Sequence, residues 1–96
     1  MTEIIWAARA LREHRDIVEG LEEVNPSAAR RIDKAITSKV TYLRTMPMIG
    51  RPGRAEGTRE LVVTRTPYIV IYDYAQDKDR AEILRVIHHA RRWPPR

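Results

Sequence analysis

The sequence contains no cysteine, no long apolar run and no internal repeat. Without cysteine the fold needs no disulfide, and thiolate metal sites and cysteine nucleophiles are excluded. No apolar stretch approaches the roughly 20 residues that a membrane-spanning helix requires. Segment 1–11 is too short and too interrupted to be a signal peptide. We therefore expect a cytoplasmic protein with no role in a membrane.

Motifs for metal and phosphate binding are also missing. The three histidines and the carboxylates show no metal-ligand spacing, so we expect neither a metal nor a cofactor. Gly50 and Gly53 stand beside Arg51 and Arg54, but this segment lacks the Lys-Ser/Thr ending and the adjoining helix of a phosphate-binding loop. We expect it to form a turn that presents two arginine side chains.

Positive charge is in excess and is unevenly distributed. The 96 residues carry a formal net charge of +5, which indicates an anionic partner such as nucleic acid or an acidic protein. Residues 49–96 hold ten Lys and Arg against six Asp and Glu, whereas residues 1–48 hold eight against seven. The surface that meets the partner is therefore expected in the second half of the chain.

Two amphipathic helices are predicted in the first half. Apolar residues recur at steps of three and four over 7–23 and again over 26–44. Asn25 is a good N-cap and Pro26 suits the first position of a helix. Because the joint is so short, the helices should form an antiparallel hairpin, and each must bury its single apolar stripe on another element.

Residues rich in Val, Ile and Tyr predict four strands. A short strand covers 2–6, and three longer ones cover 58–65, 68–74 and 80–88, separated by turn residues. The last three are joined by short connections, which require antiparallel neighbours. The strand 68–74 is apolar on both faces and therefore belongs in the middle of the sheet.

The predicted order is strand, helix, helix, strand, strand, strand, in one domain that spans residues 1–96. This is an α+β fold of the order β-α-α-β-β-β, an antiparallel sheet with an N-terminal helical hairpin packed on one face. The other face of the sheet is expected to be open to a partner.

Four segments in this order resemble the RelE/ParE superfamily of toxins from type II toxin–antitoxin systems. They are NPSAARRI at 25–32, GRPGRAEGTRELVV at 50–63, TPYIVIY at 66–72 and ILRVIHHARRWP at 83–94. The resemblance implies a microbial RNase-like fold and a role in plasmid stabilisation or addiction. It also implies growth arrest by the free toxin and neutralisation by a cognate antitoxin in a toxin–antitoxin heterotetramer.

Two activities occur in that superfamily. RelE-like members cut messenger RNA in the ribosomal A site, whereas ParE-like members inhibit DNA gyrase and lack the nuclease residues. The RelE pattern has an arginine at the position of Ile69 and basic residues near Glu60 and Val62, and none of these three is basic here. The resemblance therefore favours gyrase inhibition. The alternative is a ribosome-dependent mRNA endoribonuclease with a divergent active site.

Metal-independent RNA cleavage needs a base, an acid and cations for the phosphate oxygens. If the chain is such an mRNA interferase, the residues expected to supply them are Arg59, Arg65, Arg85, His88 and Arg91. The wider set expected to bind the target or the antitoxin shares a place in the basic second half: Arg51, Arg54, Arg59, Arg65, Arg85, Arg91, Arg92 and Trp93. A plain nucleic-acid-binding domain is a third possibility, which a strongly salt-dependent affinity for DNA would favour.

Structural roles compete with these functional ones. His88 and His89 lie at a strand end, where they can cap backbone groups, and neighbours on a strand should point apart. Arg85 interrupts an apolar run, so it points at solvent, at a partner or at a buried carboxylate such as Asp73 or Glu82.

The cognate antitoxin is expected to contribute an acidic, amphipathic segment that folds onto this domain. It should cover apolar grooves beside the helical hairpin and neutralise the arginines of the sheet. Arg85→Ala is expected to reduce toxicity more than Arg30→Ala, because Arg30 lies on a helix of balanced charge.

Overall fold

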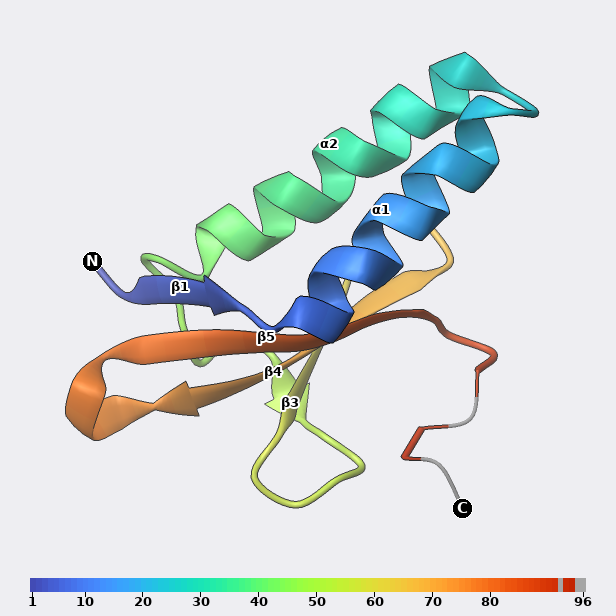
Figure 1. Cartoon of the computed structure of the whole chain (residues 1–96). Coiled ribbons are helices and arrows are strands. Elements are labelled where there is room, and N and C mark those ends of the chain that lie inside the picture. Colours follow the sequence, from blue (N-terminus) through green and yellow to red (C-terminus); the bar gives the residue numbers. More distant parts are fainter. Residues whose placement is uncertain (92, 95–96) are drawn as a thin grey trace.

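The computed structural model describes residues 1–91 and 93–94, in which two helices cover one face of a five-stranded sheet (Figure 1). The α+β class predicted from the sequence is confirmed, with the helical hairpin on one face. The elements in chain order are β1 (Glu3–Trp6), α1 (Ala8–Glu22), α2 (Pro26–Tyr42), β2 (Arg51–Pro52), β3 (Arg59–Val62), β4 (Tyr68–Ala75), the 3-10 helix η1 (Gln76–Lys78) and β5 (Arg80–His88).

The turn between the two helices lies at the predicted N-cap residue, Asn25. The Asn25 side chain accepts a hydrogen bond of 3.1 Å from the backbone N–H of Ala28, and Pro26 is the first residue of α2. This satisfies one of the donors that a helix start leaves without a partner. The buried residues of α2 are Ala29, Ile32, Ile36 and Val40, and the last three belong to the core shared with the sheet. No helix in the described part of the chain is long and apolar enough to cross a membrane.

The sheet has the strand order β1-β5-β4-β3-β2, and its middle strand is the predicted one, β4. The pairs β3–β4 and β4–β5 are antiparallel, as their short connections require. β1, however, runs parallel to β5, with Glu3 opposite Arg80, so the sheet is mixed rather than wholly antiparallel. The rule of short connections does not apply to this pair, because most of the chain lies between its strands.

A short extra strand, β2, replaces the turn that we predicted for the GRPGR segment. Arg51 of β2 pairs with Glu60 of β3, and Pro52 pairs with Arg59, in antiparallel register. A proline at this position is tolerated because β2 is an edge strand, where one row of backbone groups has no partner strand.

The sheet has buried side chains on both faces. Towards the helices, the core includes Val70 and Tyr72 of β4. The opposite face carries a smaller cluster of three isoleucines, Ile69, Ile71 and Ile87, whose exposed fractions are 3%, 0% and 2%. Leu84 and Trp93 pack against this cluster, so part of the face that we predicted to be open is covered by the chain's own C-terminal segment.

Candidate functional site

Arg85 is buried and pairs with a carboxylate from helix α1. Its Nε lies 3.0 and 2.9 Å from the two carboxylate oxygens of Glu13, and its Nη2 lies 2.7 Å from Oε2. The two side chains are only 5% and 15% exposed. Of the three roles expected for Arg85, the structure supports the buried carboxylate, although the partner is neither Asp73 nor Glu82.

This pair protects an open part of the sheet edge. β1 ends at Trp6, opposite Ile83, so the rest of β5 has no strand on that side. There the backbone N–H of Val86 donates to Glu13 Oε1 at 3.1 Å. Because a buried backbone donor without a partner is costly, Glu13 supplies what a neighbouring strand would supply. Arg85 is therefore not a free surface cation, and its expected contact with a target would require this pair to open.

Glu60 binds the two arginines of the GRPGR segment. Its carboxylate accepts hydrogen bonds from Arg51 Nη2 at 3.2 Å and from Arg54 Nε and Nη2 at 3.1 and 3.2 Å, and the backbone N–H of Arg54 adds a fourth at 2.9 Å. Burial raises the pKa of Glu60, but the hydrogen bonds from Arg54 and Arg51 outweigh it. The net result is a pKa below its ordinary value of 4.5.

The lowered pKa of Glu60 predicts a pH dependence of stability. A carboxylate with a lower pKa in the folded state stabilises the fold above its unfolded pKa, and this contribution is lost as the pH falls through the folded value. Glu60→Gln should therefore cost most free energy of unfolding at pH 6–7 and progressively less as the pH drops below about 4.5. Urea titrations across that range test this. Glu56→Gln, which changes an exposed carboxylate in the loop between β2 and β3, is the control and should show no such trend.

Arg59 and Arg65 lie away from these pairs. Arg59 Nη1 donates to the backbone carbonyls of Met48 at 3.2 Å and Gly50 at 2.9 Å, and so holds the segment that leads into β2. Arg65 is exposed in the turn between β3 and β4, with a φ of 66°. The structure does not bring these two arginines together into one site.

His88 and Arg91 line a cavity of about 220 Å³ between α1 and the end of β5, together with Tyr68 and the carboxylates of Glu13 and Asp16. His88 Nδ1 accepts a 3.0 Å hydrogen bond from the backbone N–H of Ala90, so it caps the end of the strand. This is one of the structural roles expected for it.

The two adjacent histidines do not point apart, contrary to our prediction. The ring centroids of His88 and His89 are 4.7 Å apart, with an angle of 30° between the planes. The alternation of side chains holds only within a strand, and β5 ends at His88.

Trp93 lies over the open face of the sheet. Its ring packs on the isoleucine cluster, and the guanidinium carbon of Arg85 lies 5.1 Å from the ring centroid, within the range of a cation–π contact. Its Nε1 is buried without a hydrogen-bond partner among the described residues. Arg92, the other C-terminal residue in the expected binding set, lies outside the described residues.

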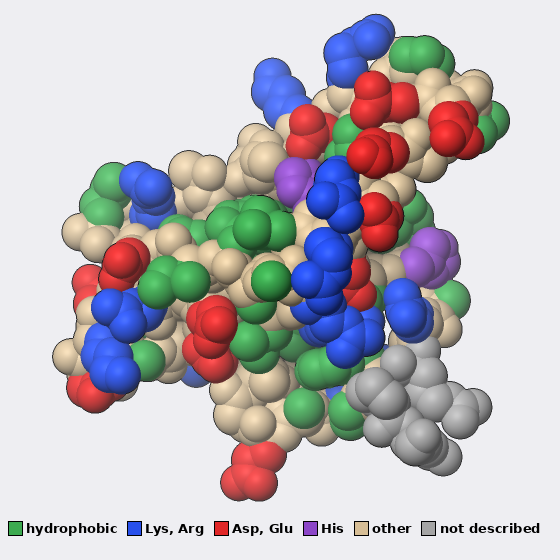
Figure 2. Space-filling view, in the orientation of Figure 1, with side chains coloured by type: hydrophobic (Ala, Val, Ile, Leu, Met, Phe, Trp, Pro, Cys, Tyr) green, Lys and Arg blue, Asp and Glu red, His purple; other side chains and the backbone are tan. Residues whose placement is uncertain are grey.

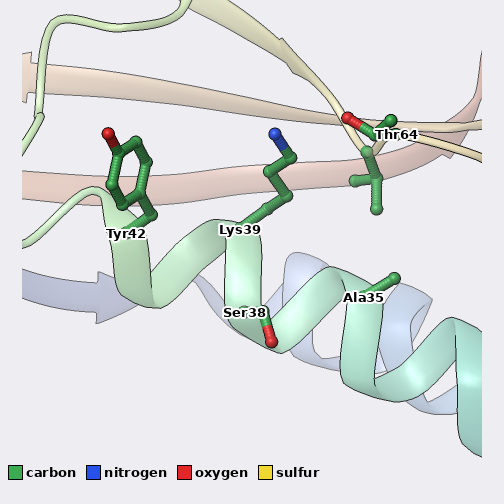
Figure 3. Close-up of a pocket in the computed structure, with 6 residues that line it drawn as sticks. Ala35, Ser38, Lys39, Tyr42 and Thr64 are labelled. Atoms are coloured by element: carbon green, nitrogen blue, oxygen red, sulfur yellow. The ribbon is translucent and has the colours of Figure 1, made fainter.

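Two adjoining grooves lie on α2, on the helical hairpin beside which the sequence analysis expected apolar grooves without naming their residues. One, of about 450 Å³, lies between α2 and the residues after β3 and is drawn in Figure 3. The second, of about 460 Å³, runs to the C-terminal end of α2 and shares Ser38 and Tyr42 with the first. Lys39 lines the first groove and Arg44 the second.

The sequence carried a signal for these grooves. Ala35, Ser38 and Tyr42 recur at steps of three and four, beside the apolar stripe that packs on the sheet. Such spacing places them on one face of the helix. Tyr42 is 48% exposed, a large fraction for an aromatic side chain within a row of this kind.

Basic side chains gather on one part of the visible face. Figure 2 shows Lys and Arg side chains in a row over the region where the hairpin meets the sheet, and acidic side chains together with a few basic ones over the outer end of the hairpin. In residues 1–91 and 93–94, no group of three or more His, Asp or Glu side chains is placed to hold a metal ion.

The fold and sequence are similar to those of known toxins. Residues 4–93 match the family model described as the ParE toxin of the type II toxin–antitoxin system parDE. A protein named "Putative toxin Y4kP" from Sinorhizobium fredii is 42% identical over 91 residues, covering 95% of this chain and 92% of the relative.

Two solved structures share the fold at lower identity. A chain of the chromosomal ParDE system of P. aeruginosa has a TM-score of 0.79 and 22% identity, covering 92% of this chain and 96% of that chain. A chain of the E. coli RelBE toxin–antitoxin complex has a TM-score of 0.69 and 15% identity, covering 96% and 100%. The match to the family model spans nearly all of the described residues, and the chain belongs to the ParE family of type II toxin–antitoxin toxins.

Proposed function

We propose that this toxin acts in the cytoplasm as a ParE-like inhibitor of DNA gyrase, which binds its target and does not cleave RNA. The main support is that two of the four arginines in the candidate nuclease set already have internal partners. Arg85 is matched by Glu13, and Arg59 is bound to backbone carbonyls. A nuclease needs cations placed in advance to bind the phosphate at the scissile bond. Arginines that hold the fold together are poorly placed for that task.

Pulse labelling after induction of the toxin tests the proposal. Incorporation of labelled precursors into DNA, RNA and protein is followed over the first minutes. A gyrase inhibitor should affect DNA synthesis first and induce the DNA-damage response. In vitro, purified gyrase with a supercoiled plasmid should yield linear DNA when the toxin is added. If translation falls first and gyrase is unaffected, the proposal is wrong.

The second candidate is a ribosome-dependent mRNA endoribonuclease, and the cavity at His88 favours it. This cavity brings together a possible general acid or base, a tyrosine and the cation of Arg91. Against it, Asp16 lines the same cavity, and a carboxylate there repels a phosphate. His88→Ala separates the candidates, because it should abolish toxicity of a nuclease and leave that of a gyrase inhibitor largely intact.

The partner that neutralises the toxin is proposed to be an acidic antitoxin, bound through an amphipathic helix in the grooves on α2. The P. aeruginosa and E. coli relatives come from toxin–antitoxin systems. The grooves offer apolar walls with Lys39 and Arg44 at their sides, which suits a helix with apolar anchors and carboxylates. A toxin–antitoxin heterotetramer remains the expected assembly.

Tyr42→Ala is predicted to weaken antitoxin binding by about tenfold or more, because an exposed aromatic side chain in a groove is a typical hot spot of binding. Co-expression with the antitoxin from the neighbouring gene, followed by titration calorimetry, measures the effect. Toxicity without antitoxin should be unchanged. Val24→Ala is the control, since Val24 is 82% exposed at the tip of the hairpin. Equal affinities of the two variants would place the antitoxin elsewhere.

A further inference from the structure

We propose that Arg51 and Arg54 form a carboxylate-binding clamp, positioned by Glu60, whose ligand is an acidic segment of a protein partner. The identification of that partner as the antitoxin rests on the proposed function. The clamp itself follows from the geometry of the loop that joins β2 and β3.

Glu60 fixes both guanidinium groups in place. Its side chain is 1% exposed, whereas the side chains of Arg51 and Arg54 are 61% and 45% exposed. One nitrogen of each arginine lies 3.2 Å from the same oxygen, Glu60 Oε1, so the two groups are neighbours. A buried anion therefore holds two cations at the surface with their positions already set.

The two guanidinium groups of the clamp have more N–H donors than their hydrogen bonds to Glu60 use. A guanidinium carries five N–H donors in a planar fork. The hydrogen bonds to Glu60 involve one nitrogen of Arg51 and two of Arg54. Two positive charges meet one negative charge, so the cluster keeps a net charge of about +1. Because the side chains are held before a ligand arrives, binding loses little conformational entropy.

The surroundings favour a protein ligand over nucleic acid. Three exposed apolar side chains belong to the segments that flank the clamp in the chain. Met48 and Ile49 precede β2 and are 52% and 43% exposed, and Val62, two residues after Glu60 on β3, is 48% exposed. Nucleic-acid backbones are bound mainly by several cations along a groove. Arginine beside exposed apolar groups is instead typical of the core of a protein interface.

A direct test uses purified toxin and a synthetic probe, a labelled peptide of repeated Glu-Glu-Leu-Leu. Affinity is measured by fluorescence anisotropy, and the Nε–Hε signals of Arg51 and Arg54 are followed by NMR. Removing both guanidiniums would leave Glu60 buried without a partner, so the main variant combines Arg51→Gln, Arg54→Gln and Glu60→Gln. It lowers the net charge by one, as does the control Arg30→Gln, whose side chain is exposed on α2.

The triple variant should bind the peptide about tenfold or more weakly, in line with the loss of charge-assisted hydrogen bonds. Arg30→Gln should stay within about twofold of the parent by the same affinity scale, and both Nε–Hε signals should shift on binding. If the triple variant does not fold, Arg51→Gln alone serves, because Arg54 still holds Glu60.

Three results would overturn the clamp. They are an unmeasurable affinity of the parent toxin for the peptide, an equal loss in Arg30→Gln, and tighter binding of a ten-nucleotide single-stranded DNA through the same arginines. Growth arrest plays no part in this measurement. A failure of the clamp is therefore distinguishable from a failure of the proposed gyrase inhibition, which is measured with gyrase and without the antitoxin.

Discussion

Replacing Arg85 by alanine is expected to lower the free energy of unfolding by about 3–5 kcal/mol, the usual cost of removing one partner of a buried ion pair. Glu13, whose side chain is 15% exposed, would lose its three hydrogen bonds from Arg85 and keep the N–H of Val86 and the more distant guanidinium of Arg9, 3.9 Å away. For a domain of this size, such a loss corresponds to a fall in Tm of at least about 10 °C. Thermal unfolding followed by circular dichroism measures it.

Arg9→Ala is the matched control. Arg9 Nε lies 3.9 Å from the same Glu13 carboxylate, but its side chain is 53% exposed. Exposed pairs contribute about 0–1 kcal/mol, so this variant should be nearly neutral. The double variant Glu13→Ala with Arg85→Ala should be more stable than the sum of the single effects implies. An Arg85→Ala variant as stable as Arg9→Ala would show that the pair contributes little.

The burial of Arg85 also gives a reason for the expected difference in toxicity between Arg85→Ala and Arg30→Ala. Arg30 is exposed on α2, so its loss should leave the fold intact. Losing Arg85 would raise the unfolded fraction and lower the amount of active toxin. Measuring the amount of soluble toxin together with growth distinguishes the two causes. Loss of a target contact leaves the amount of protein unchanged, whereas loss of the fold lowers it.

Local patterns in the sequence were sufficient to predict most elements. The helical hairpin follows from the apolar spacing and from Asn25-Pro26, whose capping bond is present. The three antiparallel strands follow from β-branched and aromatic runs with short joints. Each of these signals lies within a few residues of the structure that it specifies, which is why it can be recognised in a single chain.

The parts of the structure that the sequence did not predict depend on contacts between residues far apart in the chain. Glu13 and Arg85 are 72 residues apart in the sequence, and no local pattern links one charged residue of α1 to one of β5. The parallel pairing of β1 with β5 likewise depends on where the hairpin returns the chain. Glu60 lies only six residues from Arg54, but its pairing required knowledge of β2, a strand of two residues that contains a proline. Short edge strands of this kind give a weak sequence signal.

The excess of positive charge in the second half therefore does not by itself predict how each arginine is placed. We expected the basic second half to present its arginines to a partner, yet the described arginines there serve mainly to fix the edges of the sheet. Arg85 holds Glu13, whose carboxylate completes the edge of β5, and Arg51 and Arg54 tie β2 to Glu60. In the proposed clamp the arginines are both fixed and exposed, so their charge also remains available to a ligand.

Tyr72→Phe is predicted to cost about 2–3 kcal/mol, because the lost hydroxyl leaves two backbone groups without their partner. Tyr72 is fully buried, and its hydroxyl accepts from the N–H of Gly50 at 2.9 Å and donates to the carbonyl of Pro47 at 2.8 Å. Burial raises the pKa of Tyr72 above its ordinary value of 10.0, so the hydroxyl keeps the proton that it donates. Urea unfolding of the two proteins provides the measurement, and phenylalanine retains the packing of the ring.

Gly50→Ala should destabilise the fold by a similar amount, about 1–3 kcal/mol, through the same contact. A Cβ added at Gly50 would lie 2.7 Å from both Cε1 and the hydroxyl oxygen of Tyr72, and a ring with no exposed surface has no room to move. Gly20→Ala is the opposite case. Nothing lies within 4 Å of a Cβ there, and alanine in the interior of α1 should stabilise the helix by about 0.5–1 kcal/mol. If both glycine variants change stability in the same direction, steric contact with Tyr72 is not what requires glycine at position 50.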